Sequence, residues 1–347
     1  MLSFIDYLEE AKKLKPLKTL PLSAKGEVPA NTRGVLHELI TGYHLNGGKH
    51  MNKHEDSEGL SPKGAHDRLK ASIHPDDYKI IHDKAKSAAA HIHEHIKSQG
   101  RTITPGGIHW TSKAGDLHRS TKIHATQKED SSDIVVDTSH PTEGNRYHGI
   151  SLKSGATPKI TTANNGVESL GTNGGAIARA HVKKIKAKYP QFNNLSKDDR
   201  SEAFKNSSPE IKADIKDHTT KTLHKIAHHL HKNLEGASRG QLVQHIRNLL
   251  HAHHTPMEAE GHEHIMHNTY PTAKGVQHAT IHPATHWDHI LNNPNIPITT
   301  SRTGASISFS HPHPETGKMT TIARQSPKVS TGSDPHGGGF VSTGTPG

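Results

Sequence analysis

Apolar residues recur three and four positions apart in several segments of the chain, and this spacing predicts amphipathic helices. Thr32 is a suitable N-cap for one helix, Pro75 suits the first turn of the next, and Gly100 follows that helix as a stop signal. The predicted helices cover residues 1–15, 32–44, 75–98 and 176–188, and a helical block covers residues 196–254.

Short segments between turn residues are apolar or alternate between apolar and polar, which predicts strands. In residues 147–153 the alternation puts Ser151 and Lys153 on one face of the strand, while Leu152 faces the other side. The order of helices, strands, helical block and strands indicates an α/β or α+β domain with an inserted block; a separate helical domain is the alternative. The predicted strands are residues 108–111, 122–125, 134–136, 147–153, 305–310 and 319–324.

Composition narrows the class of protein. The 347 residues include no Cys, which excludes disulfides, thiolate zinc sites and a Cys nucleophile. No apolar run approaches the ~20 residues of a membrane helix, so no membrane partner is expected. The acidic Asp6, Glu9 and Glu10 interrupt any apolar stretch of a secretory signal. The net charge of +10 favours a polyanionic partner, most simply DNA.

Two charged residues lie where a catalytic site could form. Asp133 immediately precedes the strand 134–136, and Lys153 ends the polar face of the strand 147–153. A carboxylate can hold a divalent cation, which activates water, and a neighbouring ammonium can stabilise the charge that develops on a phosphate. Phosphodiester hydrolysis needs this combination.

The same residues resemble the PD-(D/E)XK nuclease superfamily, which has the restriction-endonuclease-like fold. That family places an Asp at the start of one strand, an acid-x-Lys on the next, and often a Glu on a preceding helix. Asp133 and Lys153 match the strands, and Glu38 in Arg-Gly-Val-Leu-His-Glu-Leu matches the helix. The resemblance spans residues 30–175 and implies Mg²⁺ (or Mn²⁺) bound by Asp133, Glu38 and the backbone carbonyl of Leu152, with Lys153 as the catalytic cation.

The chain departs from the family at Ser151, which stands where the second acid belongs. Serine is a poor magnesium ligand, so either another carboxylate replaces the missing acid or the site is inactive. Glu38 is the first candidate for this replacement, followed by Glu168 and Asp137.

The first ten residues resemble the capsid-targeting peptide of internal head proteins in large tailed myoviruses. Such peptides are amphipathic and end in an aliphatic-x-Glu motif, which Leu8-Glu9-Glu10 matches. The resemblance implies cleavage between Glu10 and Ala11 by a prohead protease, with the capsid interior as partner. An N-terminal helix that simply docks on the domain is the alternative.

The combined prediction is an α/β protein with a restriction-endonuclease-like mixed sheet flanked by helices, a mostly helical insertion and a flexible C-terminal tail. The predicted parts are a targeting peptide (1–10), a nuclease-like core (11–190), a helical insertion (191–295), returning strands of the core (296–328) and the tail (329–347).

Three functions follow from these patterns. The first is a metal-dependent phage DNA endonuclease, located in the virion interior or the host cytoplasm. The second is a non-enzymatic, basic internal virion or DNA-binding protein with a degenerate nuclease fold, which Ser151 favours. The third is a His-dependent metal-binding protein, because the chain has 35 His and because His91 and His95 share a helix face. Such a pair can hold zinc only with a third ligand.

Overall fold

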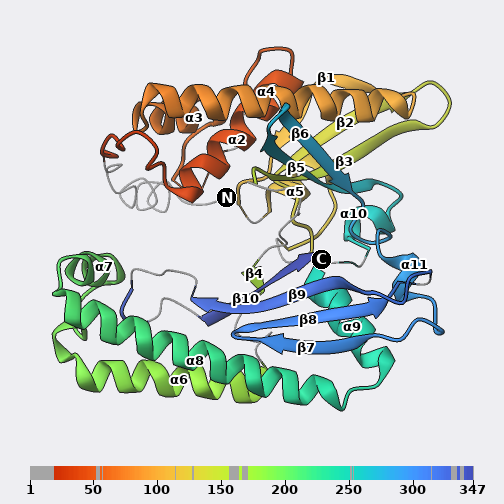
Figure 1. Cartoon of the computed structure of the whole chain (residues 1–347). Helices are drawn as coiled ribbons and strands as arrows, with labels where there is room; N and C mark the ends of the chain where they lie inside the picture. Colours follow the sequence, from red (N-terminus) through yellow and green to blue (C-terminus); the bar gives the residue numbers. More distant parts are fainter. Residues whose placement is uncertain are drawn as a thin grey trace, which may run out of the picture. The chain divides into compact units, whose positions relative to one another are not determined.

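A computed structural model gives the fold as two compact units (Figure 1). Unit 1 comprises Met1–Ala156 and Pro256–His278, and unit 2 comprises Thr157–Thr255 and Ala279–Gly347. The proposed targeting peptide with its Glu10–Ala11 cleavage site, and also Glu168, lie outside the described residues. The structure describes residues 19–51, 55–56, 58–113, 115–126, 129–155, 164–165, 171–250, 252, 254–313, 315–329, 334–336 and 340–346.

Unit 1 is built on a five-stranded mixed sheet, so the predicted α/β class is confirmed. The first three strands form an antiparallel meander, and the fourth lies parallel to the third, with Ile265 opposite Ile150. In spatial order the strands are β1 (Thr102–Trp110), β2 (Ile134–His140), β3 (Gly144–Lys153), β5 (Glu263–Thr272) and β6 (Gly275–Ile281).

Helices flank this sheet (Figure 1). On one face, α2 (Ala30–Leu45) and α4 (Pro75–Ser98) bury Leu39 and Ile92 against Ile134 and Ile150. The opposite face buries Val135 in a cluster with Leu117 and Met257, which come from α5 (Asp116–Thr121) and α10 (Pro256–Ala259). The remaining helix of unit 1 in the described chain is α3 (Pro62–Ala71).

The helix α4 begins and ends at the predicted residues, and its end signals explain why. The ring of His74 accepts a hydrogen bond from the backbone N–H of Asp76 at 3.2 Å, which caps the first turn. Asp76 and Asp77 place negative charge at the positive end of the helix dipole. The apolar stripe buries Ile81, Ala85, Ala88, Ile92 and Ile96, with Ile92 fully buried.

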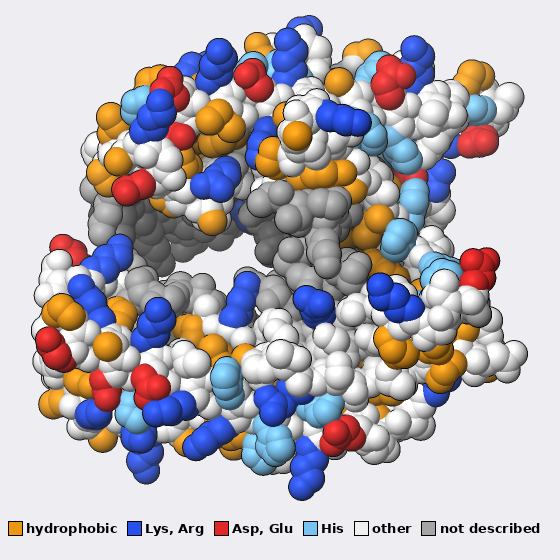
Figure 2. Space-filling model, viewed as in Figure 1, with side chains coloured by type: hydrophobic (Ala, Val, Ile, Leu, Met, Phe, Trp, Pro, Cys, Tyr) orange, Lys and Arg blue, Asp and Glu red, His pale blue; other side chains and the backbone are white. Residues whose placement is uncertain are grey.

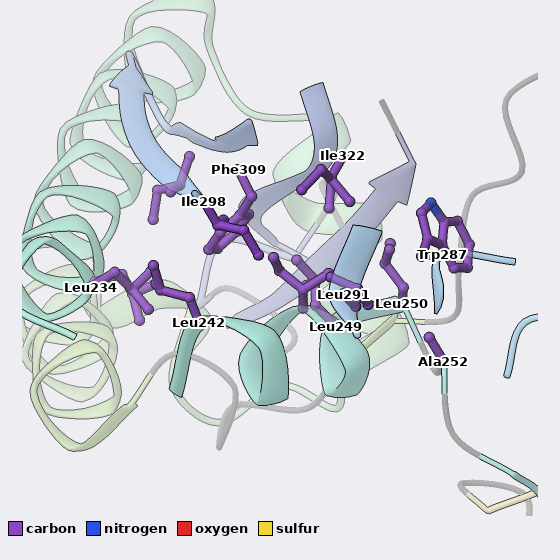
Figure 3. Packing of buried hydrophobic residues seen from close by; sticks show 14 of the residues in the cluster. Leu234, Leu242, Leu249, Leu250, Ala252, Trp287, Leu291, Ile298, Phe309 and Ile322 are labelled. Carbon is purple, nitrogen blue, oxygen red and sulfur yellow. The ribbon is translucent and has the colours of Figure 1, made fainter. Parts of the chain in front are cut away.

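Unit 2 combines helices with a second five-stranded sheet in which all strand pairs are antiparallel. Figure 3 shows its core, where Leu242 and Leu249 of one helix pack near Phe309 and Ile322 of the sheet. The longer helices are α6 (Gly171–Lys188), α7 (Lys197–Lys205), α8 (Pro209–Glu235) and α9 (Arg239–Leu250), with shorter turns η2 (Pro190–Phe192) and α11 (Asp288–Leu291). The strands, in spatial order, are β4 (Asn164–Asn165), β10 (Phe340–Pro346), β9 (Met319–Val329), β8 (Ser306–Pro312) and β7 (Thr299–Thr303).

The predicted domain organisation is wrong in three places, two of which lie in the C-terminal part of the chain. The strand signals at 305–310 and 319–324 are real, but β8 and β9 belong to the second sheet and do not return to the first. The segment 329–347, predicted as a tail, contains β10, which pairs with β9. A strand pattern identifies an extended segment but carries no information about its pairing partner, so the sequence could not separate the two sheets.

The predicted helical insertion 191–295 also contains β5 and β6 of the first sheet. These strands were missed because β5 is rich in His, Glu and Asn, although all residues from Glu263 to Thr269 are buried. The buried carboxylate of Glu263 accepts hydrogen bonds from His148 Nδ1 and from Gln99 Nε2 at 2.9 Å. Such pairing compensates for the loss of water around these polar groups.

Residues 122–125 form no strand, contrary to the prediction. Lys122 adopts a left-handed conformation with φ of 69° and ends α5 as its C-cap. An extended strand cannot start at this backbone geometry. Across the described chain, no helix is long and apolar enough to cross a lipid bilayer.

Candidate active site

The backbone around Asp133 is fixed by the meander of unit 1. Asp133 lies one residue before β2, and its N–H donates to the carbonyl of Ile150 on β3 at 2.9 Å. Its own carbonyl accepts from the N–H of Thr111, which follows β1, at 3.2 Å. Both neighbouring strands therefore hold Asp133, so its carboxylate has a defined direction.

The Asp133 carboxylate points at the end of β3. Its Oδ2 accepts from the backbone N–H of Leu152 at 2.7 Å and lies 3.4 Å from Nζ of Lys153. Lys153 Nζ also donates to Oγ of Ser151 at 2.8 Å, and that hydroxyl lies 3.5 Å from the same Asp133 oxygen. Asp133 and Lys153 keep 26% and 30% of their side-chain surface exposed, so the pair is accessible to a substrate.

Glu38 reaches this site from α2. Its Oε2 accepts a hydrogen bond from Nε1 of the buried Trp110 at 3.1 Å, which fixes the direction of the carboxylate. Burial, and then the negative charge of Asp133, raise the pKa of Glu38 to about 8, although the hydrogen bond from Trp110 and the charge of Lys153 oppose the shift. Glu38 thus interacts electrostatically with both other charged residues of the site.

This arrangement suits a hard divalent cation. The two carboxylates of Asp133 and Glu38 supply the oxygen ligands that Mg²⁺ and Mn²⁺ prefer, and the backbone of Leu152 is tied to Asp133. Burial is the larger cause of the raised pKa of Glu38, and repulsion between its negative charge and that of Asp133 adds to the shift. A bound dication would remove that repulsion, so the donor set fits the predicted metal.

The structure also separates the candidates for the missing second acid. Asp137 lies opposite Tyr147 in the β2–β3 register, six residues before Lys153 on β3. Ser151 lies four residues after Tyr147, which at about 3.3 Å per residue is roughly 13 Å along the strand, so Asp137 cannot replace the acid at Ser151. Among the described candidates, Glu38 is the carboxylate that interacts with Asp133 and Lys153.

Sequence reasoning missed His264 and Asp130, which lie beside the site. His264 is 2% exposed, and neither ring nitrogen has a hydrogen-bond partner among the described residues. Burial lowers the pKa of His264, while the negative charges of Asp130 and Asp133 oppose the shift. Asp130 accepts from the hydroxyl of Ser132 at 2.5 Å, and a Cβ on Gly149 would collide with that hydroxyl. Gly149 was the signal in the sequence, because a side chain at this position of β3 would displace the Ser132 hydroxyl that Asp130 binds.

The predicted His91–His95 pair is not a joint site. His95 Nε2 lies 3.4 Å from Oε1 of the buried Glu263. The His91 ring instead packs against His267 and His278, with centroid separations of 5.1 and 4.8 Å. His91 and His95 share a helix face, but each contacts different residues of the sheet beneath them.

Comparison of the chain with protein families, with curated proteins and with solved structures found no match.

Proposed function

We propose that unit 1 is a metal-dependent nuclease with a PD-(D/E)XK-type site and a restriction-endonuclease-like core that cleaves DNA. The observation that carries this proposal is the convergence of Asp133, Lys153 and Glu38. Glu38 comes from α2, far in the sequence from Asp133 and Lys153 on the neighbouring strands, yet Lys153 Nζ is 3.4 Å from Asp133 and both affect the pKa of Glu38. Carboxyl groups whose pKa is perturbed by burial and by a specific charged neighbour are concentrated at functional sites, which supports the proposal.

Each residue has a distinct role in this proposal. Asp133 and Glu38, with the Leu152 carbonyl, would hold Mg²⁺ (or Mn²⁺), which when bound supplies a hydroxide and neutralises charge on the phosphate. Lys153 stabilises the additional negative charge of the transition state. Ser151 accepts from Lys153 Nζ and holds the ammonium near Asp133. Trp110 orients the Glu38 carboxylate.

DNA is the substrate that the charge distribution supports. The net charge is +10, and exposed lysines follow the α6 and α8 helices of unit 2. Figure 2 shows basic side chains spread over this helical layer. Two of its lysines are already paired with acids, Lys188 with Asp214 at 2.8 Å and Lys221 with Asp217 at 2.6 Å. The remaining exposed cations, available for phosphate contacts, include Lys183, Lys184, Lys186, Lys216, Lys225 and Lys232.

Cleavage by the full-length protein tests the proposal directly. The wild-type chain is incubated with duplex DNA, single-stranded DNA or RNA in Mg²⁺, in Mn²⁺ and in EDTA. Cleavage of DNA is expected with either metal and not with EDTA, and Asp133→Asn should abolish it because the amide is neutral and holds a cation poorly. If the wild-type protein cuts no nucleic acid with either metal, or if the Asp133→Asn protein cuts as well as wild type, the enzymatic proposal fails.

DNA affinity should depend steeply on salt, because phosphate contacts release counterions. Each lost phosphate contact lowers the slope of log affinity against log salt by about 0.9, so Lys184→Gln with Lys186→Gln should reduce the slope by roughly two. Lys188→Gln is the matched control on the same helix, and it should change the slope less because Asp214 already neutralises Lys188. Fluorescence anisotropy with random duplex DNA measures both. Equal slopes for all three proteins would show that α6 does not contact phosphate.

The alternative is a non-enzymatic, basic virion or DNA-binding protein with a degenerate site, which Ser151 in the place of the second acid favours. Salt-sensitive DNA binding without cleavage would support it. A virion location, with the capsid interior and its protease as partners, is proposed on residues 1–10 alone. In that case the protein from purified particles begins at Ala11, and mass spectrometry that finds only the chain starting at Met1 would contradict it.

A further inference from the structure

Six aromatic side chains of unit 1 form a closed ring in which each one contacts the next. The centroids of neighbouring rings are 5.1–5.9 Å apart, and their planes are inclined to each other by 41–80°. Inclined planes of this kind form the walls of a cage, whereas parallel planes would form a stack. In order around this aromatic cage, the side chains are Tyr43, His50, His66, Tyr78, His82 and His44.

The aromatic cage borders a cavity of about 260 Å³. Pockets for small molecules begin at about 300 Å³, so this cavity suits the flat ring system of a small ligand or of one unit of a larger one. All six rings are partly exposed, so their faces are accessible. The residues that line the cavity are five of the rings, Tyr43, His50, His66, Tyr78 and His82, together with Ile40, Asp67 and Lys70.

Contacts between ring atoms hold the cage in shape. The hydroxyl of Tyr78 on α4 lies 3.0 Å from Nε2 of His66 on α3. Nε2 of His44 on α2 lies 3.3 Å from Nε2 of His82 on α4. Three helices are thus tied together around the cavity. A preformed wall lowers the entropic cost of binding, because these side chains are already ordered.

The charges at the cavity indicate the kind of ligand. Lys70 is exposed, and its Nζ lies 4.8 Å from the centroid of the Tyr78 ring, so a positive charge lies at the mouth. The carboxylate of Asp67 is already bonded to Nζ of Lys63 at 2.5 Å and lies 3.2 Å from Nδ1 of His66. An organic cation would be repelled by Lys70 and would find this carboxylate paired. A flat ligand with a negative charge fits both the rings and the lysine.

We propose that the aromatic cage binds the base of an unpaired nucleotide in DNA, with Lys70 in contact with its phosphate. Proteins that bind single strands combine aromatic rings, on which bases stack, with cations that contact the backbone. A paired base is stacked inside the duplex and cannot enter the cavity, so the cage favours overhangs and extruded bases. The inference rests on DNA as the substrate in the proposed function, but it does not depend on cleavage at Asp133.

The fluorescence of 2-aminopurine, an adenine analogue that is quenched when it stacks on aromatic rings, tests the proposal. The full-length protein is mixed in EDTA with a DNA duplex that carries the analogue in a single-stranded overhang, or with one in which the analogue is paired. The protein should quench the unpaired analogue. It should also bind the overhang duplex roughly 5- to 150-fold more tightly than a blunt duplex, which is the effect of stacking one base. Fluorescence anisotropy measures DNA binding separately.

Tyr43→Leu removes one ring of the cage and should reduce both the quenching and the preference for the overhang, the latter roughly fivefold or more. Tyr43→Phe keeps the ring and should behave as wild type. If Tyr43→Leu does not fold, as circular dichroism can check, His50→Leu in the segment after α2 serves the same purpose. The matched control is Tyr147→Leu, because the Tyr147 ring contacts His262 elsewhere in unit 1, with centroids 5.0 Å apart. It should quench as wild type does.

Several results would overturn the proposal. Wild type could bind the overhang duplex without quenching, the Tyr43→Leu and His50→Leu proteins could quench as wild type does, or Tyr147→Leu could lose the quenching equally. If only the free 2-aminopurine nucleotide is quenched, the cavity takes a small molecule and not DNA. If tetramethylammonium raises the melting temperature and no base is quenched, the cage takes an organic cation. Quenching by a protein that cleaves no DNA would reject the nuclease and leave this inference in place.

Discussion

Replacing Lys153 by Ala should lower the single-turnover rate of Mg²⁺-dependent DNA cleavage about 100- to 1000-fold, by analogy with the loss of one donor to a developing oxyanion. Nζ of Lys153 lies 3.4 Å from Asp133, and 30% of the Lys153 side chain is exposed, so the ammonium could reach a phosphate bound to a cation at the Asp133 carboxylate. Lys153 is proposed to stabilise the transition state and not the bound DNA. DNA affinity measured in EDTA should therefore change little, since one cation among many is lost.

Ser151→Ala is the matched control for this variant. It removes the hydroxyl that accepts from Lys153 at 2.8 Å but leaves the ammonium and both carboxylates in place. Its cleavage rate should fall only mildly. If Lys153→Ala cleaves as fast as wild type, or if Ser151→Ala is as inactive as Lys153→Ala, the role assigned to the lysine is wrong.

The sequence predicted those parts of the fold in which local pattern and burial agree. The α4 helix has an apolar stripe, a cap and a stop signal, and all three act on the same segment. Asp133 and Lys153 could be predicted as neighbours because both strands are short, apolar and close in sequence. The register then brings Leu152 N–H to the Asp133 carboxylate.

The sequence did not predict the features that depend on distant pairing. The β5 strand buries Glu263, His264 and His267, which the sequence analysis assigned to the helical insertion, because their polar side chains find partners such as His148 only in the folded sheet. The division into two sheets could not be predicted for the same reason, because strand pairing depends on contacts between segments that are distant in the sequence. The cluster of His91, His267 and His278 likewise requires β5 and β6 to be placed against α4.

Glu38→Gln should make the metal-free protein more stable at alkaline pH while it abolishes stabilisation by Mg²⁺. The folded-state pKa of Glu38 is about 8, above the value of about 4.3 expected in the unfolded chain. The protonated form therefore favours folding. This contribution is fully present below the unfolded pKa and is lost as pH rises through the folded pKa.

Wild-type protein without metal should thus lose stability between about pH 4 and pH 9 relative to the variant, whose side chain stays neutral and can still accept from Trp110. About 1 kcal/mol corresponds to about 2–4 °C in melting temperature for a unit of this size, so calorimetry at pH 6 and pH 9 can measure the difference. Glu94→Gln, at an exposed position of α4, is the control and should match wild type at both pH values.

Added Mg²⁺ reverses the order of the two proteins. If Glu38 is a ligand of the cation as proposed, the cation binds its ionised carboxylate, so Mg²⁺ should raise the melting temperature of wild type, more at pH 9 than at pH 6, and leave Glu38→Gln almost unchanged. Glu38, whose ionised carboxylate lowers the stability of the metal-free protein, would then be a ligand of the cation. If the Glu38→Gln protein melts below wild type at pH 9 in EDTA, the pKa of the Glu38 carboxyl is not raised in the folded protein. If Mg²⁺ raises the melting temperature of the Glu38→Gln variant as much as that of wild type, Glu38 is not a ligand of the metal site. Asp133 would then have no second carboxylate there.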